Sequence, residues 1–176
     1  LSFVPPTIGS TPEALPGENI YPAISDTDTV DGAIAGGGSV VKVVMDNNVA
    51  TNLVLGDKIT AAVATDTVNG AVTSGANVTM DTNVATKMAV GDQITADSRI
   101  GILDTNVVTV TAINVGSDVK VFTMSEAVAI GDGVTLTFNP KCNRSLTTVA
   151  ALNPDADNVK EFSMSQNVGL VDGVTL

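Results

Sequence analysis

The stretch Met45-Asp-Asn-Asn-Val-Ala-Thr-Asn-Leu-Val-Leu-Gly-Asp-Lys-Ile-Thr60 decides the fold, because it returns as Met80-Asp-Thr-Asn-Val-Ala-Thr-Lys-Met-Ala-Val-Gly-Asp-Gln-Ile-Thr95. Ten of the sixteen aligned positions are identical, so the two segments are copies of one unit. A looser pair begins with Met124-Ser-Glu-Ala-Val and Met164-Ser-Gln-Asn-Val, and both members end in Asp-Gly-Val-Thr-Leu. Internal repeats of about 20–50 residues indicate stacked structural units, each too small to bury its apolar face alone. The chain is therefore predicted to be a tandem array.

Composition favours strands over helices. The 176 residues are 44% hydrophobic, mostly Val, Ala, Leu and Ile, with only 3% aromatic residues. Residues branched at Cβ are stiff in a helix and pack well on a pleated sheet. In Val134-Thr-Leu-Thr-Phe138, apolar and polar residues alternate with the period of a half-buried strand. We predict an all-β fold of small antiparallel modules that resemble barrels or sandwiches.

Proline and glycine mark a separate N-terminal segment. Five of the seven prolines lie within residues 1–38, where they disfavour helix interiors and central strands, and Ala35-Gly-Gly-Gly38 supplies a flexible end. We predict that residues 1–38 form an extended arm lying on the first module or on a neighbouring subunit. The partner contacts are expected from the apolar side chains of this arm: Phe3, Val4, Ile8, Leu15, Ile20 and Tyr21.

The repeats divide the rest of the chain into three predicted modules. The first spans residues 39–97 and holds both direct copies, the second spans 98–140, and the third spans 141–176. Within the first, Asn69-Gly70 between two β-prone pairs predicts a tight hairpin. The third module stops at Leu176, whereas Leu136 is followed by Thr-Phe, and the chain itself begins with Leu-Ser-Phe. We therefore expect the third module to be truncated and the natural polypeptide to continue past both ends.

Little in the sequence supports catalysis. The chain has no histidine, which excludes Ser-His-Asp and Cys-His relays and histidine-bound metals, and Cys142 is its one cysteine, favoured as a small packed residue over a reactive thiol. Acid–base work would fall to carboxylates, but four aspartates recur at repeated Gly-Asp or Asp-Gly turns and are predicted to cap those turns: Asp57, Asp92, Asp132 and Asp172. The repeated methionines are predicted to fill cores: Met45, Met80, Met124 and Met164. We expect no enzymatic activity and no cofactor.

Two oxygen-rich segments are candidate calcium sites. Neither residues 26–32 nor residues 153–158 have the ligand spacing and distal glutamate of the helix-flanked calcium loop. They are therefore weak candidates for a stabilising divalent cation, through the following side chains: Asp26, Asp28, Asp31, Asp155 and Asp157.

The net charge and the lack of long apolar runs limit the kinds of partner that the chain can bind. A formal net charge of −11, with eight scattered basic residues, disfavours nucleic acid, because phosphate neutralisation needs clustered lysine and arginine. No apolar run reaches the roughly 18 residues that would span a bilayer, so no membrane partner is predicted. Charged residues make up 15% of the chain, against roughly 25% in average domains. A surface so poor in charged residues must be covered by Thr, Ser, Asn and Ala, which is common in shells, fibres and sheaths that pack against copies of themselves.

Three parts of the repeats stand out as a set: residues 80–92 (Met-Asp-Thr-Asn-Val-Ala-Thr-Lys-Met-Ala-Val-Gly-Asp), residues 151–158 (Ala-Leu-Asn-Pro-Asp-Ala-Asp-Asn), and Phe-Ser-Met-Ser at 162–165 with Asp-Gly-Val-Thr-Leu at 172–176. Together they resemble the repeats of virion structural proteins from tailed phages of marine cyanobacteria. The resemblance covers the chain from Val41 onward and leaves out the proline-rich arm. It implies a virion component without fixing its place on the particle.

The resulting hypothesis is a non-enzymatic structural protein at the virion surface that decorates or cements the capsid. Its expected partners are other capsid or tail subunits and further copies of itself. One alternative is a fibre or tail-associated module for host contact, and another is a cell-surface adhesin or sheath protein. Trimeric intertwining in solution would favour the fibre.

Overall fold

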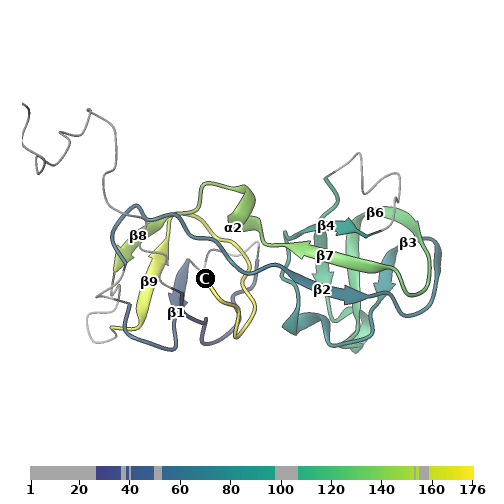
Figure 1. Ribbon diagram of the computed structural model, residues 1–176, viewed down its shortest axis with the longest axis horizontal. Helices are drawn as coiled ribbons and strands as arrows, with labels where there is room; N and C mark the ends of the chain where they lie inside the picture. The colour runs from purple at the N-terminus through teal and green to yellow at the C-terminus, as the bar shows by residue number, and fades with distance from the viewer. Residues whose placement is uncertain are drawn as a thin grey trace, which may run out of the picture.

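The computed structural model describes residues 27–36, 39, 41–49, 53–97, 107–152, 154 and 159–176. In these residues nine strands form three antiparallel sheets of three strands each, so the predicted all-β fold is confirmed. Figure 1 shows two lobes side by side. Each lobe has its own buried core and is called a module below.

The inner module is one continuous segment, residues 64–139. One of its sheets has the order β2-β7-β4 and the other has the order β3-β6-β5. The strands are β2 (Ala64–Thr67), β3 (Val72–Thr79), β4 (Gln93–Ala96), β5 (Val110–Ile113), β6 (Val121–Ile130) and β7 (Thr135–Asn139), with single 3₁₀ turns η1 (Val84–Thr86) and η2 (Val115–Ser117).

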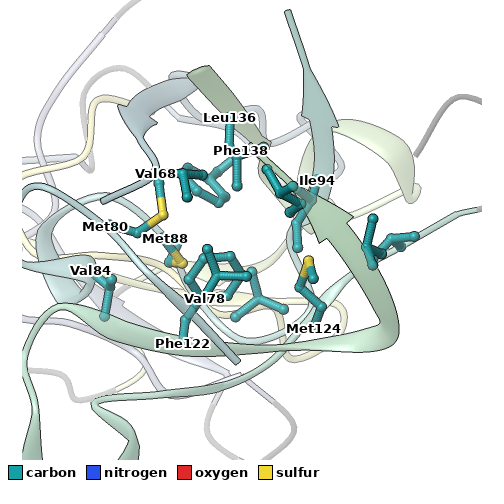
Figure 2. Close-up of a cluster of buried hydrophobic side chains, with 14 residues drawn as sticks. Val68, Val78, Met80, Val84, Met88, Ile94, Phe122, Met124, Leu136 and Phe138 are labelled. Atoms are coloured by element: carbon teal, nitrogen blue, oxygen red, sulfur yellow. The ribbon is translucent and has the colours of Figure 1, made fainter. Parts of the chain in front are cut away.

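Side chains from both sheets fill the inner core (Figure 2). Strand β7 alternates as predicted: Leu136 and Phe138 are fully buried, and the residues on either side of each are half-buried. The ring of Phe138 meets that of Phe122 from β6 edge to face, with centroids 5.7 Å apart. Burying a large apolar side chain contributes roughly 1.5–3 kcal/mol, so these residues tie the two sheets into a sandwich.

The outer module is discontinuous and combines residues 27–61 with residues 141–176. Its sheet has the order β1-β9-β8, formed by β1 (Lys42–Val44), β9 (Glu161–Met164) and β8 (Val149–Leu152), and α2 (Lys141–Arg144) is a single helical turn beside it. Isolated bridges join Thr29 to Thr175 and Ile34 to Leu170. The outer core therefore draws on both ends of the described chain: Val30, Ile34, Val43, Met45, Val49, Ile59, Ala61, Cys142, Val149, Phe162, Met164, Val168 and Leu170.

The two modules arrange the repeated segments in the same way. Of the two copies of each repeated sequence segment, one lies in each module. Met45 and Met80 both form a bridge, to Val30 and Val68 respectively. The amide of Gly56 donates to the carbonyl oxygen of Val149 at 2.9 Å, and the amide of Gly91 donates to that of Val110 at 2.8 Å. All four repeated methionines are at most 3% exposed, which confirms their predicted role as core residues: Met45, Met80, Met124 and Met164.

This pairing overturns the predicted module boundaries. Residues 39–97 do not form one module, because their two direct copies belong to different cores. For the same reason the segments 98–140 and 141–176 are not modules of their own: most of the first completes the inner core and the second completes the outer core. The arm cannot reach residue 38 either, since Val30 and Ile34 are buried in the outer core. The rest of the predicted arm, residues 1–26, lies outside the described residues.

The predicted hairpin at Asn69-Gly70 is also wrong. Strand β2, before it, pairs with β7, and strand β3, after it, pairs with β6. The chain turns a corner from one sheet to the other at this point, with Gly70 at a φ of 85°. The chain does turn at Asn69-Gly70, as its sequence indicates. The flanking strands pair with different partners because burial of apolar side chains in the core places them in different sheets.

Candidate interaction surface

The modules meet where a turn of the inner module packs against two glycines of the outer module. A Cβ added at Gly36 would lie 2.1 Å from the carbonyl oxygen of Val90, and one added at Gly169 would lie 2.7 Å from the Cβ of Ala89. Both distances are shorter than real Cβ contacts, so only glycine lets the backbones approach this closely. We call Gly36 and Gly169 the glycine pair.

Asp92 fixes the turn that rests on the glycine pair. Its side chain is only 3% exposed and accepts hydrogen bonds from the amide of Ala89 at 2.8 Å and from that of Lys141 at 3.2 Å. Burial raises the pKa of Asp92, and the two amides together with the charge of Arg144 oppose that effect without cancelling it. Arg144 also donates from Nη2 to the carbonyl oxygen of Gly91 at 2.7 Å. The carboxylate thus links the turn to the start of α2.

The equivalent turn of the outer module has no such cover among the described residues. Asp57 accepts from the amide of Val54 at 2.9 Å, as Asp92 accepts from that of Ala89. Yet Val54 is 63% exposed and Leu55 is 65% exposed, whereas Ala89 is 6% exposed. We call Val54 and Leu55 the outer tip. Two large apolar side chains thus face solvent where the sister module has a buried Ala89 and a half-buried Val90.

Four more exposed apolar residues fall at two pairs of equivalent positions. The amide of Ile59 donates to the carbonyl oxygen of Thr147, and the amide of Ile94 donates to that of Val108. Leu146 and Val107 directly precede these two acceptors and are therefore equivalent. Val159 and Val119 form the other pair. Their carbonyl oxygens accept from the amides of the repeated valines Val49 and Val84, respectively. Because the exposure recurs in both modules, it belongs to the repeat.

The other two recurring aspartates close a different turn. Asp132 accepts from the amide of Gly70 at 2.7 Å and Asp172 accepts from that of Gly32 at 2.8 Å. The predicted capping of the local turn is therefore confirmed for Asp57 and Asp92. Asp132 and Asp172 instead tie their turns to a glycine in a distant segment of the chain.

The calcium candidates are only partly described. Asp28 accepts from Asn47 through the backbone amide at 3.0 Å and the side-chain amide at 2.7 Å. Burial alone would raise the pKa of Asp28, but hydrogen bonds from Asn47 and Thr29 outweigh it and hold the pKa below its usual value. Asp31 is exposed, and the remaining candidates lie outside the described residues: Asp26, Asp155 and Asp157. In the described part of the chain, no three potential metal ligands gather.

Two other sequence predictions concern single residues. Cys142 is fully buried in the outer core, and burial, with Asp92 nearby, raises the pKa of its thiol to about 11. It is the small packed residue that was expected. The predicted partner-contact residues all lie outside the described part of the chain: Phe3, Val4, Ile8, Leu15, Ile20 and Tyr21.

A pocket of about 170 Å³ lies at the junction of the modules, lined by residues that include Ala62, Lys87, Asp92 and Pro140. Both carboxylate oxygens of Asp92 already accept backbone hydrogen bonds. The carboxylate is therefore engaged in holding the turn and is poorly placed to act as a base.

The sequence interpretation missed the glycine pair and the outer tip. A signal for both was present in the differences between repeat copies. Val54-Leu55 replaces Ala89-Val90 within an otherwise similar segment, and Gly169 stands where the earlier copy has Ala129. The contact residues are thus the ones that the repeat copies do not share.

Comparisons with protein-family models, curated proteins and solved structures gave no match for this chain. Among the residues that the structure describes, no helix is long and apolar enough to cross a membrane. What the chain does is therefore inferred from its own repeats, junction and surface.

Proposed function

We propose that this chain is a non-enzymatic structural component of a phage particle that decorates or cements the capsid. The observation that carries the proposal is that two copies of one β-module are joined by a close backbone contact, in which the Ala89-Val90 turn packs on the glycine pair. Such a chain is made of units that pack against one another, and this is what a cement protein needs.

The residues behind the resemblance to phage virion repeats support this proposal. In residues 80–92 and 172–176, the recurring residues serve as core side chains or turn caps, as Met80, Val84 and Asp92 do. The repeated sequence thus specifies the β-scaffold of the modules and the junction between them. Conservative repetition of a scaffold, with variation at contact turns, is typical of repeat proteins that bind through their surfaces.

The lengthwise arrangement of the two modules favours a fibre or tail-associated host-contact module as the second candidate (Figure 1). The two candidates differ in where the chain sits on the particle. A capsid cement occupies the shell lattice, whereas a fibre extends from the tail.

The test is to locate the chain on purified particles of a phage that encodes it, by electron cryomicroscopy and antibody labelling. Density between capsid subunits supports the cement proposal, and density on the tail supports the fibre. Absence from particles, with presence on the host surface, would favour the adhesin or sheath alternative and reject both virion proposals.

Arm deletion gives a second test, and the structure changes its design. Removing residues 1–38 would take Val30 and Ile34 out of the outer core and unfold that module. Removing residues 1–26 leaves the described core residues in place. If the arm binds a neighbouring capsid subunit, this shorter deletion will abolish attachment to particles while the circular dichroism spectrum of the free protein keeps its strand signature. Undiminished attachment would reject the arm's role in cementing.

A further inference from the structure

We infer that the outer tip, Val54 and Leu55, docks onto a further β-module of the same type, on a neighbouring chain, that has glycine at the positions equivalent to Gly36 and Gly169. The geometry of the junction carries this inference whether or not the chain belongs to a virion.

The turns at the outer tip and at Ala89-Val90 are equivalent. Gly56 and Gly91 donate equivalent backbone hydrogen bonds, and both have a positive φ, of 92° and 100°. Asp57 and Asp92 cap their turns through the same oxygen, Oδ2, at 2.9 Å and 2.8 Å. The outer tip therefore has the backbone shape of a turn that, in this same molecule, is seated on a glycine pair.

The outer tip is unusually apolar for an exposed surface turn. Val54 and Leu55 are both more than 60% exposed, and each is at least as large as its counterpart in the inner module, Ala89 or Val90. Adjacent exposed apolar side chains on a protein surface mark sites of association. Here the sister turn indicates what kind of surface covers them.

A second copy of this chain offers no acceptor for the outer tip on the surface that the structure describes. In each copy, the glycine pair is already occupied by that copy's own Ala89-Val90 turn. The equivalent surface of the inner module has Ser74 and Ala129, because Ile34 and Leu170 pair as Val72 and Ile130 do. Ser74 corresponds to Gly36, where an added Cβ would lie 2.1 Å from the Val90 carbonyl oxygen, and Ala129 corresponds to Gly169, where it would lie 2.7 Å from the Ala89 Cβ.

The chain thus presents a free tip and, on its described surface, no free matching acceptor. A contact between unlike surfaces extends into an open array only if each unit carries both. Two exposed residues with side chains, Ser74 and Ala129, prevent this chain from extending itself. The partner must therefore supply the acceptor.

The inference is tested by creating the acceptor in this protein. In the double variant Ser74→Gly/Ala129→Gly, the outer tip of one molecule gains a glycine pair on the inner module of another. We expect head-to-tail association, seen as a sedimentation coefficient that rises with concentration well above that of the unmodified protein at the same concentrations. Adding Leu55→Asp should weaken the association at least about tenfold, equivalent to about 1.4 kcal/mol.

The controls separate docking from misfolding. The double variant and its Leu55→Asp derivative should have the same circular dichroism spectrum and closely similar thermal midpoints. If the double variant does not fold, the single variants Ser74→Gly and Ala129→Gly are tested for weaker association that depends on Leu55. Folded glycine variants that stay monomeric would overturn the inference, and so would association of the unmodified protein that Leu55→Asp abolishes, because the partner would then need no glycine pair.

Discussion

Asp92 and Asp57 occupy the same turn in the two modules, but their surroundings differ. Asp92 accepts two amide hydrogen bonds in a buried site, whereas Asp57 is half-buried and accepts one from Val54. Leaving a buried donor unsatisfied costs roughly 1–3 kcal/mol. We therefore expect Asp92→Ala to lower the free energy of unfolding by about 2–4 kcal/mol and Asp57→Ala by about 1 kcal/mol or less. Urea denaturation followed by circular dichroism measures both, and equal losses would contradict the junction role of Asp92.

Cys142 offers a chemical probe of the outer core. Its thiol is fully buried with a pKa of about 11. At pH 8 about one molecule in a thousand would carry the thiolate, against roughly a quarter for an ordinary cysteine. We expect alkylation by iodoacetamide to be at least about 100-fold slower in the native protein than in urea-unfolded protein, as measured by mass spectrometry. Equal rates would mean that the outer core opens readily around α2.

At the scale of elements, the strand content and the core methionines could be predicted, because β-branched composition and period-two alternation are local properties. The partners of the strands could not. Thr67 and Val72 flank a sound turn signal, yet they pair with strands more than fifty residues away, Thr135 and Ile130. Which face each strand buries decides its partner, and that depends on the whole core.

The junction could be predicted only in part for a similar reason. The Asp caps recur in the sequence, and recurrence marked them as structural. The glycine pair comes together only when the two parts of the outer module fold, since Gly36 and Gly169 lie at opposite ends of the chain. No local pattern reports such a contact.

The turn on the glycine pair should tolerate no added methyl group. In Gly36→Ala the new Cβ meets the backbone oxygen of Val90 at 2.1 Å, so backbone must move. Overpacking of this kind costs roughly 1–3 kcal/mol. Gly131→Ala is the matched control, because the nearest atom to its Cβ would be a Val134 methyl at an ordinary 3.6 Å. We expect the control to change the unfolding midpoint little, and a harmless Gly36→Ala would mean that the two modules are not in fixed contact.

At the scale of the whole molecule, the chain enters the outer module, completes the inner module, and returns. The outer core cannot close until residues as distant as Thr29 and Thr175 meet. The inner core needs only residues 64–139. Because loop closure costs more entropy for distant residues, the inner module can fold first and hold the two parts of the outer module close together.

This connectivity predicts which fragments fold. Residues 62–140 contain a whole core, whereas residues 98–176, a fragment of the same length, contain half of each core. We expect the first fragment to give dispersed amide resonances and a cooperative thermal transition, and the second to remain unfolded. If the sequence-based boundaries at 98–140 and 141–176 were correct, the second fragment would hold one complete module with the truncated third module, and its complete module would fold. Two-dimensional NMR of both fragments therefore decides between nested and consecutive modules, and a folded 98–176 fragment beside an unfolded 62–140 fragment would reject the nested arrangement.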